Sequence, residues 1–332
     1  MTVAAALWGA EKCQDVGPSL AGLSCDLAPL STAPASPGST ANLPPSAPVK
    51  HSHIEWTTHT FNPWIGCTKV SPGCLHCYAE VRDQRFAGGL HWGPGSPRHR
   101  TSTWSEPRRW DRAAARPAPP LPGDRPKVFC ASLGDWLDDE VPAAWLADLL
   151  GLVLGTRHLN WQLLTKRPRN FRARLSAALP LVDEPATRGR VEEWLDGRPP
   201  GHVWLGTTVE DRRRAEERIP RLCALPAVVR FLSVEPLLEE IDLQATAAGP
   251  RPDLQWVIVG GESGHGARPM AAAWVRSLRD QCAALDVPFF FKQWGCHDEA
   301  GRPCSKKAGG RLLDGQTHNG WPHGFEPLAA AA

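Results

Sequence analysis

Three cysteines, Cys67, Cys74 and Cys77, lie close together in the stretch "GCTKVSPGCLHCYAE", residues 66–80. Thiolates at such short spacing bind soft or borderline metals, and zinc and iron–sulfur clusters are the two common outcomes. Structural zinc takes four protein ligands, and an electron-transfer 4Fe-4S cluster normally takes four cysteines. The chain has no second Cys-x2-Cys pair. Three thiols therefore predict a 4Fe-4S cluster with one iron left open for a small molecule.

Two alternatives to the cluster remain open at this point. Zinc could bind the same thiols, and the fourth ligand would then come from His53, His59 or His76. The thiols could also be unliganded.

The composition limits the class of protein. Hydrophobic residues make up 42% and charged residues 22% of the 332-residue chain, which are ordinary values for a globular protein. No apolar run reaches the roughly 18 residues that a membrane span needs. The net charge of +2 argues neither for nor against a polyanionic partner. Ten cysteines are too dilute for a secreted disulfide scaffold, so we expect a soluble cytoplasmic protein without a membrane partner.

The chain divides into three parts by composition. Residues 1–50 include "APLSTAPASPGSTANLPPSAP", which is too rich in proline, serine and alanine to bury a core, so we predict a disordered N-terminal segment. Residues 51–325 have the regular pattern of one domain, and residues 326–332 form a short tail.

Apolar runs alternate with helical patterns in the central part. Continuous runs of this length are typical of strands that are buried on both faces, and strands alternating with helices predict a parallel sheet. With a further strand at 54–66, the predicted strands number seven, and this number favours a complete or partial TIM-type (βα) barrel over a doubly wound sheet. The predicted strands are 127–135, 158–166, 202–211, 228–235, 254–262 and 287–292, and the predicted helices are 142–155, 211–225 and 271–286.

Each predicted strand ends on or near a charged residue. In a barrel, the carboxyl ends of the strands carry the active site, so these charges are expected at one mouth together with the cysteine loop. A lysine that follows an apolar run needs a buried partner or a phosphate. The residues are Asp135, Lys166, Glu210, Asp211, Glu235, Glu262 and Lys292.

Several separated motifs resemble those of an uncharacterised phage-associated family with a three-Cys motif, itself similar to radical S-adenosylmethionine proteins. The resemblance covers about residues 52–322 and rests on "IEWTTHTFNPWIGCTKVSPGCLHCYAE", "ASLGDW", "LLTKRP", "SVEPLL", "VIVGGESG", "FFFKQWG" and "KKAGGRLLDG". It implies that Cys67, Cys74 and Cys77 hold a 4Fe-4S cluster and that S-adenosylmethionine chelates the open iron. It also implies an electron-donor protein. The usual radical motif is Cys-x3-Cys-x2-Cys with an aromatic residue before the last cysteine, whereas this chain has Cys-x6-Cys-x2-Cys with His76 there.

The resemblance and the chemistry of carboxylates suggest roles for the strand-end residues. Radical enzymes use a Gly-Gly-Glu segment for the methionine amino group, and Gly260, Gly261 and Glu262 form such a segment on a late strand. Glu262 or Glu235 would bind the methionine end, and Glu210 or Asp211 the ribose hydroxyls, because carboxylates accept from ammonium and hydroxyl groups.

The remaining strand-end residues have less specific roles. Asp135 is a candidate cofactor contact or the start of a helix. Lys166 and Lys292, together with Glu235, are candidate catalytic residues. The expected reaction is reductive cleavage of S-adenosylmethionine to a radical that attacks an unknown substrate.

A second function from another class remains open. Residues 86–126 and 212–221 are rich in arginine, which indicates either a solvated face or a nucleic-acid interface. The chain would then be a noncatalytic nucleic-acid-binding protein of phage or mobile-element origin, stabilised by zinc or an iron–sulfur cluster.

Overall fold

The computed structural model describes residues 52–246 and 252–325. These residues belong to one compact unit, residues 48–332. The predicted disordered segment 1–50 and the predicted tail 326–332 lie outside the described residues.

A seven-stranded parallel sheet forms the centre of this unit. The six apolar runs all form strands in it, which confirms the α/β class and the parallel sheet. The strand order follows the chain order, unlike that of a doubly wound sheet, in which the order reverses. The strands are β1 (His59–Thr60), β4 (Lys127–Cys130), β5 (Asn160–Thr165), β6 (Val203–Thr208), β7 (Val229–Val234), β8 (Trp256–Gly260) and β9 (Phe289–Gln293).

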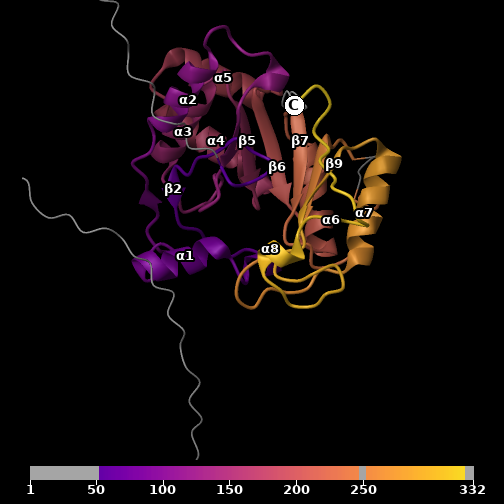
Figure 1. Ribbon diagram of the computed structural model, residues 1–332. Helices are drawn as coiled ribbons and strands as arrows, with labels where there is room; N and C mark the ends of the chain where they lie inside the picture. The colour runs from indigo at the N-terminus through magenta and orange to yellow at the C-terminus, as the bar shows by residue number, and fades with distance from the viewer. Residues whose placement is uncertain (1–51, 247–251, 326–332) are drawn as a thin grey trace, which may run out of the picture. The chain divides into compact units, whose positions relative to one another are not determined.

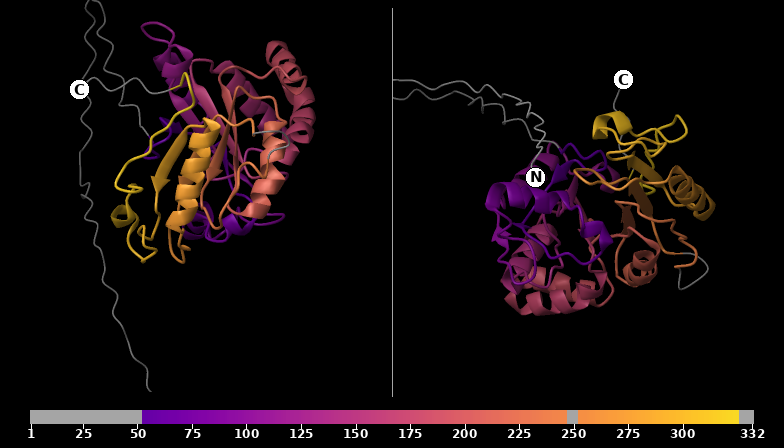
Figure 2. Two further views of the ribbon diagram at one scale, coloured as in Figure 1. Left: turned by 90° about the vertical axis from the view of Figure 1, so that its right-hand side faces the viewer. Right: turned by 90° about the horizontal axis from the view of Figure 1, so that it is seen from below.

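Helices cover the outer face of the sheet (Figures 1 and 2). Outward residues such as Leu163, Leu205 and Val257 pack with apolar helix residues in one large core cluster. The three predicted helices are confirmed as α3 (Ala143–Gly155), α6 (Arg212–Cys223) and α7 (Ala272–Leu285). The helices that the apolar pattern did not predict are α1 (Tyr78–Ala87), α2 (Glu106–Ala114), α4 (Phe171–Ala178), α5 (Pro185–Leu195) and α8 (Lys306–Gly309).

Aromatic contacts on the inner face show that the sheet curls. Neighbouring strands lie about 4.8 Å apart, so β4 and β8 would be about 19 Å apart in a flat sheet. Trp56 nevertheless contacts both Phe129 of β4, at 4.7 Å between ring centroids, and Trp256 of β8, at 6.3 Å. Within the described residues no strand pairing joins β9 to β1, so the curled sheet is open between these two strands.

The predicted strand at 54–66 is only partly present. The β1 segment has two residues and pairs with β4, whereas β2 (Trp64–Ile65) pairs antiparallel with β3 (His99–Arg100) in a separate two-stranded sheet. Pro63 lies between β1 and β2 and has no backbone N–H to continue the ladder of the main sheet. The chain leaves the main sheet there, and this brings the cysteine loop over the strand ends.

The inner face has room for only a glycine at one position of β6. A Cβ atom at Gly206 would lie 2.3 Å from the Phe231 ring on β7. Gly206→Ala should therefore lower the free energy of unfolding by about 1–3 kcal/mol, as overpacking of a core does. Gly151→Ala in α3 should instead raise it by up to about 1 kcal/mol, because alanine favours a helix more than glycine does and the added Cβ would meet no atom within 4 Å beyond the helix's own neighbouring backbone. Urea unfolding measures both, and a stabilised Gly206→Ala protein would contradict the packing of the inner face.

The described helices show no membrane-crossing candidate. None of them has both the length and the apolar character that a span requires.

Candidate functional site

A cavity of about 500 Å³ lies at the carboxyl ends of the strands. Four of the predicted strand-end residues line it, namely Asp135, Lys166, Glu235 and Lys292. The cysteine loop covers it, so that Cys67, Cys74 and Cys77 also line it. The arrangement of strands and loop therefore brings the predicted metal ligands and the predicted catalytic residues to one cavity.

The alternation of side chains along each strand explains why the cavity is polar at the rim and apolar below. Successive side chains of a strand point to opposite faces, so residues two apart share a face. On β7 the inner face continues from the buried Phe231 to Ser233, and on β9 from Phe290 to Lys292. On β6, Thr208 follows Gly206 in the same way.

The cysteine loop joins β2 to α1. Cys74 ends a short 3-10 helix (Pro72–Cys74), and Cys77 is the residue that precedes α1. The Cys74 Sγ lies 3.8 Å from the Ser71 hydroxyl, and the Cys67 Sγ lies 3.5 Å from Arg167 Nη1. Among the described residues, no three or more histidine, cysteine, aspartate or glutamate side chains are grouped so that they could hold a metal ion. The thiols thus share a cavity, but binding of a metal requires their sulfurs to converge.

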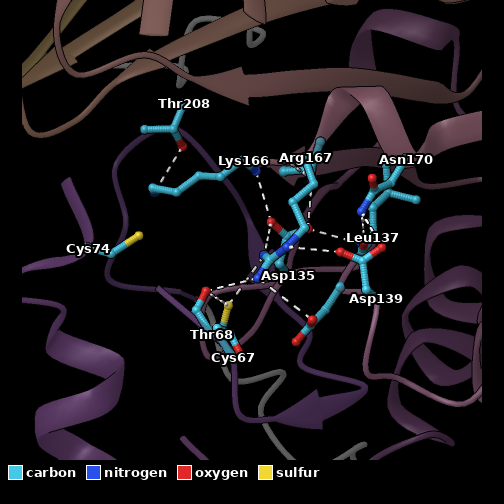
Figure 3. Close-up of polar contacts among 12 residues, drawn as sticks. Cys67, Thr68, Cys74, Asp135, Leu137, Asp139, Lys166, Arg167, Asn170 and Thr208 are labelled. Atoms are coloured by element: carbon cyan, nitrogen blue, oxygen red, sulfur yellow. Dashed lines mark hydrogen bonds and ion pairs between the residues drawn. The ribbon is translucent and has the colours of Figure 1, made fainter. Parts of the chain in front are cut away.

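Arg167 connects the cysteine loop to Asp135 (Figure 3). Its Nη1 donates to Asp135 Oδ2 at 3.0 Å, and its Nη2 donates to the Thr68 carbonyl at 2.9 Å. Asp135 also accepts from the Thr165 hydroxyl at 2.6 Å and from the backbone N–H of Lys166 at 2.9 Å. Asp135 therefore fixes the end of β5 and, through Arg167, the position of Cys67. The strand-end pattern did not single out Arg167, although it directly follows Lys166 in "LLTKRP".

Burial keeps two of the thiols in their neutral form. It raises the pKa of Cys67 to about 12, although the positive charge of Arg167 opposes the rise. Burial also raises the pKa of Cys77, against a hydrogen bond from the backbone of Glu80 and the charge of Lys166. A metal that binds these thiols must displace their protons, so its own charge has to stabilise the thiolates.

Glu235 and Lys292 form an ion pair at the rim of the cavity. The Lys292 Nζ lies 2.8 Å from Glu235 Oε1, and the Ser233 hydroxyl donates to Glu235 Oε2 at 3.2 Å. A Cβ atom at Gly260 would lie 2.8 Å from Glu235 Oε1, so a larger residue there would displace the Glu235 carboxylate. Gly261 has a similar role, because its Cβ would lie 1.9 Å from the Trp294 carbonyl oxygen. In this structure both glycines allow close packing.

Two other predicted acids hold the cysteine loop from outside the cavity lining. Glu262 pairs with Arg268, whose Nε donates to it at 2.8 Å and whose Nη2 donates to the Pro72 carbonyl at 3.0 Å. Although burial opposes it, the hydrogen bonds from Arg268 keep the pKa of Glu262 below its usual value. Glu210 pairs with Arg218 at 2.9 Å and accepts from the Gly73 backbone N–H at 3.3 Å.

The remaining predicted residues lie apart from these contacts. Asp211 caps the first turn of α6 by accepting from the Arg214 N–H at 2.8 Å. Of the three candidate histidine ligands, His53 lines the cavity. His59 stacks on Trp110 at 4.2 Å between ring centroids. His76 lies next to Gly266.

Many arginines of the two arginine-rich segments are engaged within the chain. Arg98 is buried and pairs with Asp138 at 2.8 Å, and Arg100 pairs with Asp148 at 2.8 Å. In α6, the side chains of Arg213, Arg214 and Arg218 pair with Glu217, Asp211 and Glu210. These contacts account for a part of the positive charge without a polyanionic partner.

Comparison with known proteins places the chain in a family. A family model described as "Protein of unknown function (DUF5131)" matches residues 51–322. The chain belongs to this family. The match includes all seven strands of the main sheet and every residue that lines the cavity. Neither the curated proteins nor the solved structures contain a match to the chain.

Proposed function

We propose that this member of the DUF5131 family is an iron–sulfur enzyme of the radical S-adenosylmethionine type. The observation that carries the proposal is that Cys67, Cys74 and Cys77 line one cavity together with strand-end residues of a parallel sheet. Active sites of barrel-type α/β enzymes lie at this edge. The curled sheet with sequential strand order would then be a partial (βα) barrel.

The proposal of a cluster rests on the three thiols, which would leave one iron open for a small molecule. A closed tetrahedral zinc site needs a fourth ligand, and His53 is the candidate histidine that lines the cavity and could supply it. A cavity of about 500 Å³ is also within the range of about 300–1,000 Å³ that small-molecule sites occupy. In this proposal the three cysteines hold a 4Fe-4S cluster, and S-adenosylmethionine occupies the rest of the cavity.

The bound cluster would supply an electron for reductive cleavage of S-adenosylmethionine, and a separate electron-donor protein would reduce the cluster. The chain itself would bind and orient the cluster and S-adenosylmethionine and would exclude water from the cavity. Arg167 holds Cys67, while Arg268 and Glu210 hold the backbone of Pro72 and Gly73. The Glu235–Lys292 pair presents a carboxylate and an ammonium to the ligand at the rim.

Anaerobic reconstitution with iron and sulfide tests the proposal. We expect about four irons and four sulfides per chain and a brown protein that absorbs visible light, as thiolate-bound clusters do. Addition of S-adenosylmethionine should change the electron paramagnetic resonance spectrum of the reduced cluster. Cys223→Ser is a suitable control, because Cys223 is half-buried outside the cavity lining. It should take up as much iron as the unchanged protein.

Two results would count against the enzyme. A colourless protein that retains one zinc after anaerobic purification and takes up no iron would favour the structural-metal alternative. A loss of iron in the Cys223→Ser protein as large as the loss in a Cys74→Ala protein would show that iron uptake is not specific to the cavity.

A further inference from the structure

Several charged side chains around the cavity form ion pairs within the chain, but Lys166 does not among the described residues. Lys166 is half-buried and lines the cavity, but it has no carboxylate partner in the part of the chain that the structure describes. Its ammonium makes one side-chain hydrogen bond there, to Thr208 Oγ1 at 3.3 Å. The charges that are balanced lie in the pairs Glu235–Lys292, Lys69–Glu80 and Asp135–Arg167.

The direction of this hydrogen bond leaves donors for a ligand. An ammonium has three N–H donors and no acceptor, so in its contact with Lys166 the Thr208 hydroxyl must accept. The Thr208 hydroxyl proton is then available to a second acceptor. Thr208 is only 1% exposed, which fixes its position at the end of β6. Figure 3 shows the Lys166 side chain running away from Asp135 and Arg167 toward Thr208.

A half-buried ammonium with one neutral partner is incompletely satisfied. Removing a charge from water is costly unless an opposite charge or enough hydrogen bonds replace the water. Two acids of the cavity lining, Asp135 and Glu235, are already bound to Arg167 and Lys292. An anionic group of a ligand would accept from both Lys166 and Thr208 and would complete the charge balance.

We propose that Lys166 and Thr208 form a subsite for an anionic oxygen group, a carboxylate or a phosphate, on the substrate. The apolar side chains of Trp56, Phe129 and Leu164 line the same cavity and would contact the uncharged part of that molecule. The substrate class is thus a small organic anion. The assignment of the anionic group to a substrate rests on the enzyme function proposed above. The binding of an anion by Lys166 and Thr208 does not depend on that function.

Calorimetric titration of the full-length protein tests the subsite. Inorganic phosphate and succinate, each at constant ionic strength, are the probes, and they distinguish a phosphate from a carboxylate. Because a hydrogen bond to a charged group contributes about 10- to 100-fold in affinity, Lys166→Met should weaken binding of the preferred probe by at least about tenfold. Thr208→Val should also weaken binding of the preferred probe. This second variant keeps the test valid if the Lys166→Met protein does not fold.

Lys307→Met is the matched control for lost charge. Lys307 is exposed on α8, next to the cavity-lining Lys306, and removing its charge should change the affinity by less than about twofold. Absence of saturable binding of either probe up to about 100 mM, or equal losses in Lys166→Met and Lys307→Met, would overturn the subsite.

Iron uptake separates this inference from the proposed function. The Lys166→Met protein should still take up iron, because it keeps all three sulfur ligands and the side-chain hydrogen bond that it loses goes to Thr208. Failure of iron uptake in the unchanged protein would reject the enzyme, while Lys166-dependent anion binding would remain measurable.

Discussion

Cys74→Ala should abolish binding of the iron–sulfur cluster while leaving the protein folded. Replacing even an outer partner of a metal ligand costs about 10- to 100-fold in metal affinity, so loss of a ligand should reduce the iron content at least that much. Cys74 is 8% exposed, and its truncation to alanine should lower the free energy of unfolding of the metal-free protein by about 1 kcal/mol. Iron analysis and urea unfolding measure the two effects.

The same variant separates the enzyme from a protein that zinc holds together. Metal binding contributes on the order of 10 kcal/mol to the folding of small structural zinc domains, so loss of a structural ligand would unfold such a site. Here the core clusters of the sheet and its helices are formed by other residues. An unfolded Cys74→Ala protein, or one that keeps its full iron content, would therefore contradict the proposed role of Cys74.

Arg167→Met should produce the largest loss of stability among variants at the cavity. The side chains of Arg167 and Asp135 are 4% and 6% exposed, and their ion pair measures 3.0 Å. Removing one partner of a buried pair leaves the other charge buried without compensation and costs about 3–5 kcal/mol. We expect a decrease of this size in the free energy of unfolding, measured with urea. Iron uptake should also fall, because Cys67 loses its contact with the guanidinium.

Arg213→Met is the control for the loss of an arginine. Arg213 is 74% exposed and pairs with Glu217 at 3.0 Å, and such surface pairs contribute at most about 1 kcal/mol. Arg167→Lys is a second comparison, since it keeps the charge but not the planar fork that reaches Asp135 and Thr68 together. Equal stability losses in Arg167→Met and Arg213→Met would show that the buried pair does not organise the strand end.

Local sequence patterns were sufficient to predict most of the sheet. Most residues of runs such as 229–234 and 256–260 are apolar because both faces of these strands are buried, one under helices and one in the inner aromatic cluster. The strand-end rule then predicted that Asp135, Lys166, Glu235 and Lys292 share a cavity with the cysteines. Parallel strands in sequential order all present their carboxyl ends at one edge, so this part of the site follows from the order of elements along the chain.

Helices with few apolar residues or strong charge, such as α1 and α2, were not predicted. Their apolar pattern is weak, and they are positioned by contacts with distant segments. Tyr78 of α1 donates to the Ser132 carbonyl, and Asp111 of α2 hydrogen-bonds His158. Such contacts join residues whose proximity no periodicity in the sequence indicates.

The sequence by itself determined which chemical groups reach the carboxyl edge of the sheet, because strand periodicity and strand order are local properties. Only the tertiary structure decided which of these groups remain available to a ligand. Glu210 and Glu262 bond to Arg218 and Arg268, and Glu210 and Arg268 also bond to the backbone of the cysteine loop. Lys166, in contrast, has no carboxylate partner among the described residues. The physical reason is that a buried charge pairs with whichever opposite charge the fold brings within a few ångströms, and that distance depends on the packing of segments far apart in the chain.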